Sequence, residues 1–160
     1  MHHWQRFRTF KQRGEWVELQ FMAQAALRGF SVSKPWGDCS AYDVGIEHNS
    51  HFLRVQVKST TCKTQFGYLC QFKPCPHGRP YTLDQVDLFA AYVIPEDVWY
   101  LIPAATLLRG RGQKATTLFP IEPKHPARYR FEGYREAWAL LSNSRDDLCA
   151  ADKPVGSIGI

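Results

Sequence analysis

The stretch YDVGIEHNSHFLRVQVK, residues 42–58, has the clearest structural pattern in the chain. Two runs rich in Val, Ile, Leu and Phe flank a polar His-Asn-Ser-His segment that has the composition of a turn. The pattern predicts a β-hairpin. Because side chains on a strand alternate between its two faces, we expect Gln56 and Lys58 on one face and Val55 and Val57 on the other.

The polar faces of the two predicted strands carry groups that can act together. Alternation places Asp43 on the face of the first strand that is opposite Val44 and Ile46. Where the polar faces of both strands coincide, Asp43 comes near Gln56 and Lys58. A carboxylate, an amide and an ammonium group then converge at the edge of a sheet.

An amphipathic helix is predicted ahead of this hairpin, over Glu15–Leu27. Val17, Phe21 and Ala25 recur every four residues and form one apolar row, and Gly29 follows as a helix C-cap. The helix begins with two acidic residues that lie on neighbouring rows of one face. Two interpretations of these acidic residues stay open. They are either solvated side chains that interact favourably with the helix dipole, or carboxylates that belong to a functional site.

These motifs resemble those of a known nuclease superfamily. An Asp at the start of one strand, followed by a strand that ends in Gln56-Val57-Lys58, resembles the PD-(D/E)XK nuclease core, with Gln in the acidic position of the last motif. The segment Gly14-Glu15-Trp16-Val17-Glu18, together with Arg28-Gly29-Phe30, resembles the first helix of archaeal Holliday junction resolvases and of group I intron-associated endonucleases. The intron-associated enzymes are the more similar, since they tolerate Gln in that acidic position.

The resemblance implies an α/β fold with a restriction-endonuclease-like core, in which helices flank a central mixed β-sheet. It also implies an Mg²⁺-dependent endonuclease that hydrolyses DNA phosphodiester bonds and is either homing-endonuclease-like or junction-resolvase-like. Mn²⁺ is an alternative to Mg²⁺ as the metal ion. Cutting two strands favours a homodimer or higher homo-oligomer. Two alternatives stay open: a catalytically degenerate DNA-binding module, which Gln56 favours, and an RNA-directed nuclease.

The same resemblance suggests roles for particular residues. In the resolvases the active-site Glu stands four residues after the Gly, which selects Glu18 here and leaves Glu15 in second rank. The expected catalytic set is Glu18, Asp43, Gln56 and Lys58. Because Mg²⁺ prefers oxygen ligands, the two carboxylates and the Val57 carbonyl are the expected metal ligands. Lys58 would orient the attacking water or stabilise developing negative charge.

Length and composition predict one nuclease-like domain over 1–160, with a core at about 11–141, a basic N-terminal arm at 1–13 and a loose C-terminal tail at 143–160. The chain is 44% hydrophobic and 14% aromatic, which argues against disorder. It has no apolar run of membrane-spanning length and no signal-peptide pattern, so we expect a cytoplasmic protein without a membrane partner. Five cysteines in such a chain are expected as reduced thiols.

The formal net charge of +5 and the pI near 9.0 suit a polyanionic partner. Basic residues in the N-terminal segment and in two later loops are the candidates for nucleic-acid contacts: Arg6, Arg8, Lys11, Arg13, Lys63, Arg109, Arg111 and Lys114. The alternative for the N-terminal segment is a helical lead-in whose aromatic residues pack on the core.

Other segments complete the expected domain. Two apolar runs, Leu88–Ile94 and Val98–Ile102, predict the central hairpin of the sheet, and Tyr134–Leu141 predicts a C-terminal helix that packs on it. A zinc set is conceivable from residue type alone, with Cys62, Cys70, Cys75 and His77. Their spacing lacks the Cys-x-x-Cys pair that is typical of zinc sites, which argues against it.

Overall fold

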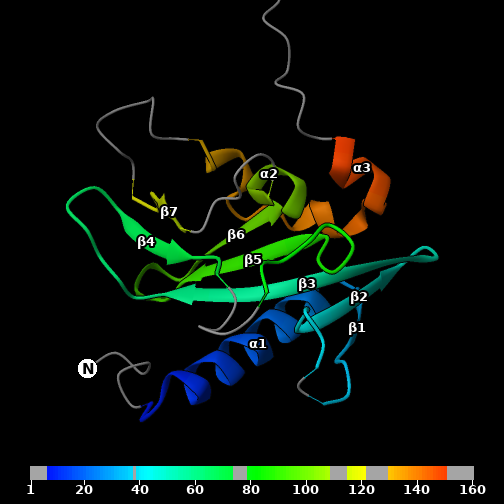
Figure 1. The fold of residues 1–160 in the computed structure, drawn as a ribbon, viewed down its shortest axis with the longest axis horizontal. Helices are drawn as coiled ribbons and strands as arrows, with labels where there is room; N and C mark the ends of the chain where they lie inside the picture. Colours follow the sequence, from blue (N-terminus) through cyan, green and yellow to red (C-terminus); the bar gives the residue numbers. More distant parts are fainter. Residues whose placement is uncertain (1–6, 38, 74–78, 109–114, 122–129, 151–160) are drawn as a thin grey trace, which may run out of the picture.

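The computed structural model describes residues 7–37, 39–73, 79–108, 115–121 and 130–150. A mixed five-stranded sheet in the order β1-β2-β3-β5-β6 forms the middle layer. Helix α1 covers one face of this sheet, and α2 with a small sheet of β4 and β7 covers the other (Figure 1). The bounds are α1 Phe10–Leu27, β1 Ser31–Ser33, β2 Val44–His48, β3 His51–Thr60, β4 Tyr68–Gln71, β5 Leu88–Val93, β6 Val98–Pro103, α2 Ala104–Leu108 and β7 Ala115–Leu118.

The predicted hairpin is present as β2 and β3. The two strands pair antiparallel from Val44 opposite Val55 to the last pair before the turn. Asn49 and Ser50 form that turn with φ values of 46° and 64°, the left-handed pair that suits the twist of a two-residue hairpin loop. Strand β3 then pairs parallel with β5, which makes the sheet mixed and places β3 at its centre.

The two faces of β3 separate as alternation predicts. Val55 and Val57 are buried in the core that also contains Val17, Phe21 and Ala25 of α1. The opposite face of the sheet packs against β4, β7 and α2 in a second core, built around buried aromatic and aliphatic side chains. Gln56 and Lys58 therefore project away from the helix-covered core, as the sequence predicts.

Helix α1 is longer than predicted at its N-terminal end. It begins at Phe10, because the Thr9 hydroxyl caps it by accepting a 3.1 Å hydrogen bond from the Gln12 N–H. The Phe7 ring packs on Trp16 at 5.2 Å between centroids, so residues 7–13 of the predicted arm belong to the helix and its lead-in. Residues 1–6 of that arm lie outside the described part of the chain.

The hairpin of β5 and β6 lies to one side of the sheet, so the prediction that it is central was wrong. β6 is an edge strand whose residues are nevertheless all buried, because its side chains lie in the cores on both faces of the sheet and the segment at 131–142 runs along its edge. The Glu136 N–H donates to the Trp99 carbonyl at 2.8 Å, and Trp99 N–H donates to the Glu136 carboxylate at 2.6 Å. A continuous apolar run in the sequence fits a central strand and a covered edge strand equally well, so it cannot distinguish between them.

The predicted C-terminal helix is two short 3₁₀ helices, η4 (Glu132–Tyr134) and η5 (Trp138–Ser142). Glu136 interrupts them with a φ of 48°, which no helical residue adopts. Trp138 and Leu141 still pack in the core against α1, as expected of that segment. 

The predicted loose tail also contains regular structure. Helix α3, Arg145–Ala150, follows η5 and buries Leu148, whereas residues 151–160 lie outside the described part of the chain. The Arg145 side chain contacts the buried Asp87 carboxylate at 3.1 Å. Asp87 also accepts hydrogen bonds from the backbone N–H and the guanidinium of Arg54, at 2.7 to 2.9 Å. This buried carboxylate at the start of β5 therefore ties β3 and α3 together.

None of the helices in the described residues is both long and apolar enough to span a membrane.

Candidate active site

Asp43 lies where the ladder between β2 and β3 opens. Its backbone N–H makes the last rung, at 2.9 Å from the Val55 carbonyl. Two residues further along β3, the Val57 N–H has no backbone partner on β2. It donates instead to Asp43 Oδ2, at 2.8 Å. The N–H and C=O of one strand residue point to the same side, so the Val57 carbonyl faces this gap as well.

Gln56 is buried and contacts the same Asp43 oxygen as the Val57 N–H. Its Nε2 lies 2.5 Å from Asp43 Oδ2. Because a carboxylate only accepts hydrogen bonds, the amide nitrogen has to face Asp43 and the amide oxygen turns away from it. In this arrangement Gln56 orients the carboxylate.

The charges around Asp43 show which groups converge on it. The pKa of Asp43 is raised from 3.8 to about 6, mainly because the carboxyl is buried and also because the carboxylate of Glu18 is nearby. The hydrogen bond from the Val57 N–H and the ammonium groups of Lys58 and Lys34 act in the opposite direction on the same pKa. A residue of α1, residues of β3 and Lys34, which follows β1, thus act on one carboxylate.

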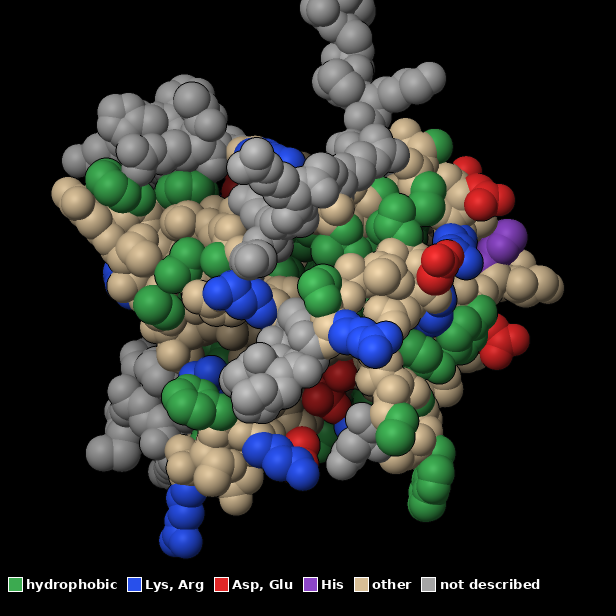
Figure 2. Space-filling model, viewed as in Figure 1, with side chains coloured by type: hydrophobic (Ala, Val, Ile, Leu, Met, Phe, Trp, Pro, Cys, Tyr) green, Lys and Arg blue, Asp and Glu red, His purple; other side chains and the backbone are tan. Residues whose placement is uncertain are grey.

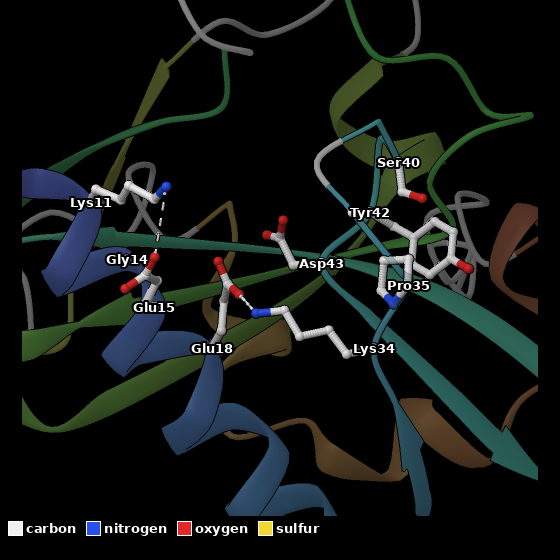
Figure 3. Close-up of a pocket in the computed structure, with 10 residues that line it drawn as sticks. Lys11, Gly14, Glu15, Glu18, Lys34, Pro35, Ser40, Tyr42 and Asp43 are labelled. Carbon is white, nitrogen blue, oxygen red and sulfur yellow. Dashed lines mark hydrogen bonds and ion pairs between the residues drawn. The ribbon is translucent and has the colours of Figure 1, made fainter.

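Glu18, Lys34 and Asp43 line a pocket of about 300 Å³ between α1 and the segment that leads from β1 to β2, whereas Gln56, Val57 and Lys58 are not among its lining residues. Figure 3 shows Glu18, Lys34 and Asp43 facing one another across it. Ser40 and Tyr42 contribute to its wall on the β2 side. In the space-filling view, acidic side chains lie recessed near α1, with Lys and Arg side chains on the surface around them (Figure 2).

Two glutamates of α1 line the pocket at different depths. The side chain of Glu18 is 19% exposed and forms an ion pair with Lys34. No pattern in the sequence indicated Lys34 as a site residue. The side chain of Glu15 is 55% exposed and pairs only loosely with Lys11, at 4.0 Å. Glu18 follows the buried Val17 along the helix, so the packing of α1 on the sheet holds it close to Asp43.

Lys58 has a partner that the sequence did not indicate. Its Nζ donates a hydrogen bond to the Tyr81 hydroxyl at 2.9 Å, and the Tyr81 ring packs edge-on against Phe89 of β5 at 5.5 Å. Tyr81 stands in a polar segment between β4 and β5 without periodicity, so no sequence signal marked it.

Only some of the basic residues expected to contact nucleic acid fall in the described part of the chain. Lys11 lines the pocket, and Arg8 and Lys63 are exposed elsewhere. Arg13 is half-buried, with its guanidinium 5.1 Å from the Phe10 ring centroid, and reaches towards β3. The other candidates lie outside the described residues: Arg6, Arg109, Arg111 and Lys114.

The zinc set receives no support from its described members. Cys62 is exposed, whereas Cys70 is fully buried between β4 and the main sheet, and burial raises the pKa of its thiol to about 12. Cys75 and His77 lie outside the described residues.

A hard divalent cation fits the pocket by ligand type. Within the described ranges no group of three or more His, Cys, Asp and Glu side chains is placed to hold a metal ion. A cation would therefore depend on the two carboxylates of Glu18 and Asp43 and on the Val57 carbonyl. All three donors are oxygens, which suits Mg²⁺ or Mn²⁺ with water completing the coordination.

Comparisons with known proteins bear on the fold and the family of the chain. The chain is similar to the structure of a bacterial homing endonuclease, I-Ssp6803I, with a TM-score of 0.71 and 24% sequence identity over 91% of this chain and 97% of that one. That likeness confirms the predicted restriction-endonuclease-like fold. No curated protein gives a significant match. The family model described as PD-(D/E)XK endonuclease matches residues 8–141, which include the helix, the hairpin and the pocket. The chain belongs to the PD-(D/E)XK endonuclease family.

Proposed function

We propose that this protein is a metal-dependent endonuclease that hydrolyses DNA phosphodiester bonds in the pocket between α1 and β2. The observation that carries the proposal is the convergence of Glu18, Lys58 and the Val57 backbone on the Asp43 carboxylate. These groups come from α1 and β3, and Asp43 itself directly precedes β2. A fold that needed Asp43 only as a turn cap would not bring a second carboxylate and a lysine to it.

Glu18, Asp43 and the Val57 carbonyl would hold the divalent cation. Once bound, the cation neutralises charge on the scissile phosphate and lowers the pKa of the attacking water. The Val57 N–H and the Gln56 amide fix the Asp43 carboxylate from two directions, so the ligand is already oriented before the substrate arrives.

Lys58 would place its ammonium group beside the phosphate oxygens as negative charge develops there. Its hydrogen bond to Tyr81 limits the positions that the flexible side chain can take. We assign Lys58 an electrostatic role, because its positive charge acts on the Asp43 carboxylate.

The substrate class and the assembly follow from the same proposal. DNA is preferred because the fold is that of a homing endonuclease structure and the chain carries a formal charge of +5. Cutting both strands requires two active sites or two successive events, which favours a homodimer. Analytical ultracentrifugation with and without duplex DNA measures the assembly directly.

Incubation of the purified protein with supercoiled plasmid, a four-way junction and RNA of matched sequence tests the proposal, with Mg²⁺, Mn²⁺ or EDTA. Metal-dependent nicking or linearisation of DNA is the expected result. Cleavage of RNA alone would identify the RNA-directed alternative. Salt-sensitive DNA binding without cleavage, across plasmids that carry a library of random sequences, would identify the DNA-binding module that Gln56 keeps open.

A further inference from the structure

Lys34 lies inside the cluster that the proposed function assigns to a metal ion. It follows β1 directly, and its side chain extends across the pocket to the Glu18 carboxylate on α1 (Figure 3). Asp43 stands on the other side of the same pocket, and the charge of Lys34 acts on it. An ammonium group therefore balances the two carboxylates that would otherwise face each other.

Lys11 provides a contrast within the same pocket. It also lines the pocket, but its ammonium is 4.0 Å from Glu15, and both side chains are largely exposed. The Glu18 side chain that holds Lys34 is far less exposed than Glu15. Ion pairs between exposed groups contribute little free energy. The half-exposed Lys34 reaches a recessed carboxylate, so its ion pair with Glu18 is screened less by water and salt than that of Lys11 with Glu15.

We propose that Lys34 is a tethered counter-cation that occupies the carboxylate site in the metal-free protein and is displaced from Glu18 when a divalent cation binds. This inference rests on the proposed function and adds a residue to its site. The Lys34 ammonium contacts Glu18 Oε2, so a divalent cation bound to the same carboxylate would lie close to this positive charge and repel it. The ion pair with Lys34 therefore lowers the apparent affinity of the site for metal.

The inference predicts a specific change in affinity when the tethered cation is removed. Lys34→Met keeps the length and apolar stem of the side chain but removes its charge. We expect the variant to bind Mn²⁺ about fivefold more tightly, the factor that corresponds to a lost contact of about 1 kcal/mol. Lys34→Arg keeps a positively charged side chain at this position and should bind Mn²⁺ like the wild type.

The test measures free Mn²⁺ by electron paramagnetic resonance during titration of the full-length protein without nucleic acid. Lys11→Met is the matched control, because it removes one positive charge from the same pocket without touching Glu18. It should change the affinity by less than about twofold, since exposed charges are screened. Thermal unfolding of each variant verifies that the fold is retained, and Asp43→Ala identifies the binding that belongs to this site.

Tighter Mn²⁺ binding in Lys34→Met, with Lys11→Met and Lys34→Arg near the wild type, supports the inference. An equal gain in Lys11→Met would show a general charge effect and overturn it. Asp43-dependent binding that Lys34→Met leaves unchanged or weakens would also overturn it, while the proposed function stands. If no Mn²⁺ binding depended on Asp43, both the inference and the proposed metal site would be wrong.

Discussion

The N–H of Val57 and the carboxylate of Asp43 are joined by a 2.8 Å hydrogen bond at the point where β2 stops pairing with β3. This bond makes an acidic side chain take the place of a neighbouring strand. The register of the hairpin therefore sets the position of the candidate site, because a shift by one residue would turn Asp43 to the opposite face.

Replacing Asp43 by Asn should reveal the cost of burying its charge. The pKa of Asp43 is raised to about 6, so the contribution of this group to stability is fully present below its unfolded value of 3.8 and is lost as pH rises through about 6. Relative to Asp43→Asn, the metal-free wild type should lose up to about 3 kcal/mol of unfolding free energy between about pH 4 and about pH 8. Urea unfolding across this range measures it.

The same comparison in the presence of Ca²⁺ provides a control. A bound divalent cation favours ionised Asp43, so the wild type should regain stability at high pH while Asp43→Asn does not. A constant difference between the two proteins at every pH would contradict the raised pKa.

Tyr81→Phe should weaken catalysis without disturbing the fold. The substitution removes the hydroxyl that accepts from Lys58 Nζ and keeps the ring that packs on Phe89. We expect single-turnover cleavage to slow by about tenfold, with little change in nucleic-acid binding or melting temperature. In a Lys58→Met background the same substitution should have almost no further effect. Additive losses in the double variant would show that Tyr81 acts independently of Lys58.

Gln56→Glu should make the pocket more dependent on metal. The new carboxylate would face Asp43 at the position from which the Gln56 amide now donates at 2.5 Å. Without metal, this like-charge contact should cost about 1–3 kcal/mol of unfolding free energy at neutral pH. Saturating Mn²⁺ should therefore raise the melting temperature of the variant more than that of the wild type. If Mn²⁺ raised the melting temperature of both proteins equally, the bound cation would not interact with the side chain at position 56.

Asp87 should matter for stability more than for chemistry. Its carboxylate is buried and accepts from Arg54 on β3 and Arg145 on α3. Asp87→Ala leaves both guanidinium groups without this partner and should cost about 3–5 kcal/mol. Arg145→Ala removes a half-exposed partner and should cost about 1 kcal/mol. Denaturant unfolding measures both values, and similar losses for the two variants would contradict this view of Asp87 as the centre of the network.

Local patterns in the sequence were sufficient for the elements that define the fold. Alternation in 42–58 predicts the hairpin and the separate faces of Val57 and Lys58, and the four-residue spacing in α1 predicts its buried row. These features depend on the period of one strand or one helix, which a single sequence displays. The encounter of Asp43 with Gln56 follows from the same alternation.

Features that depend on tertiary contacts were not predictable in this way. The 3₁₀ geometry around Glu136 arises because this residue pairs with the edge of β6, and the order of α3 depends on Arg145 reaching Asp87. Tyr81 and Lys34 enter the site from irregular segments, where no periodicity fixes the direction of a side chain. In each case the deciding partner is distant in sequence.

The most direct test is the metal-dependent DNA cleavage rate of Asp43→Asn and Glu18→Gln beside that of Glu47→Gln. Glu47 is an exposed carboxylate on the same strand as the Asp43 site, which makes it a matched control for loss of one charge. The proposed site predicts that cleavage falls by about a hundredfold or more in the first two variants and stays near the wild-type rate in the third. Wild-type cleavage that survives in Asp43→Asn would contradict it.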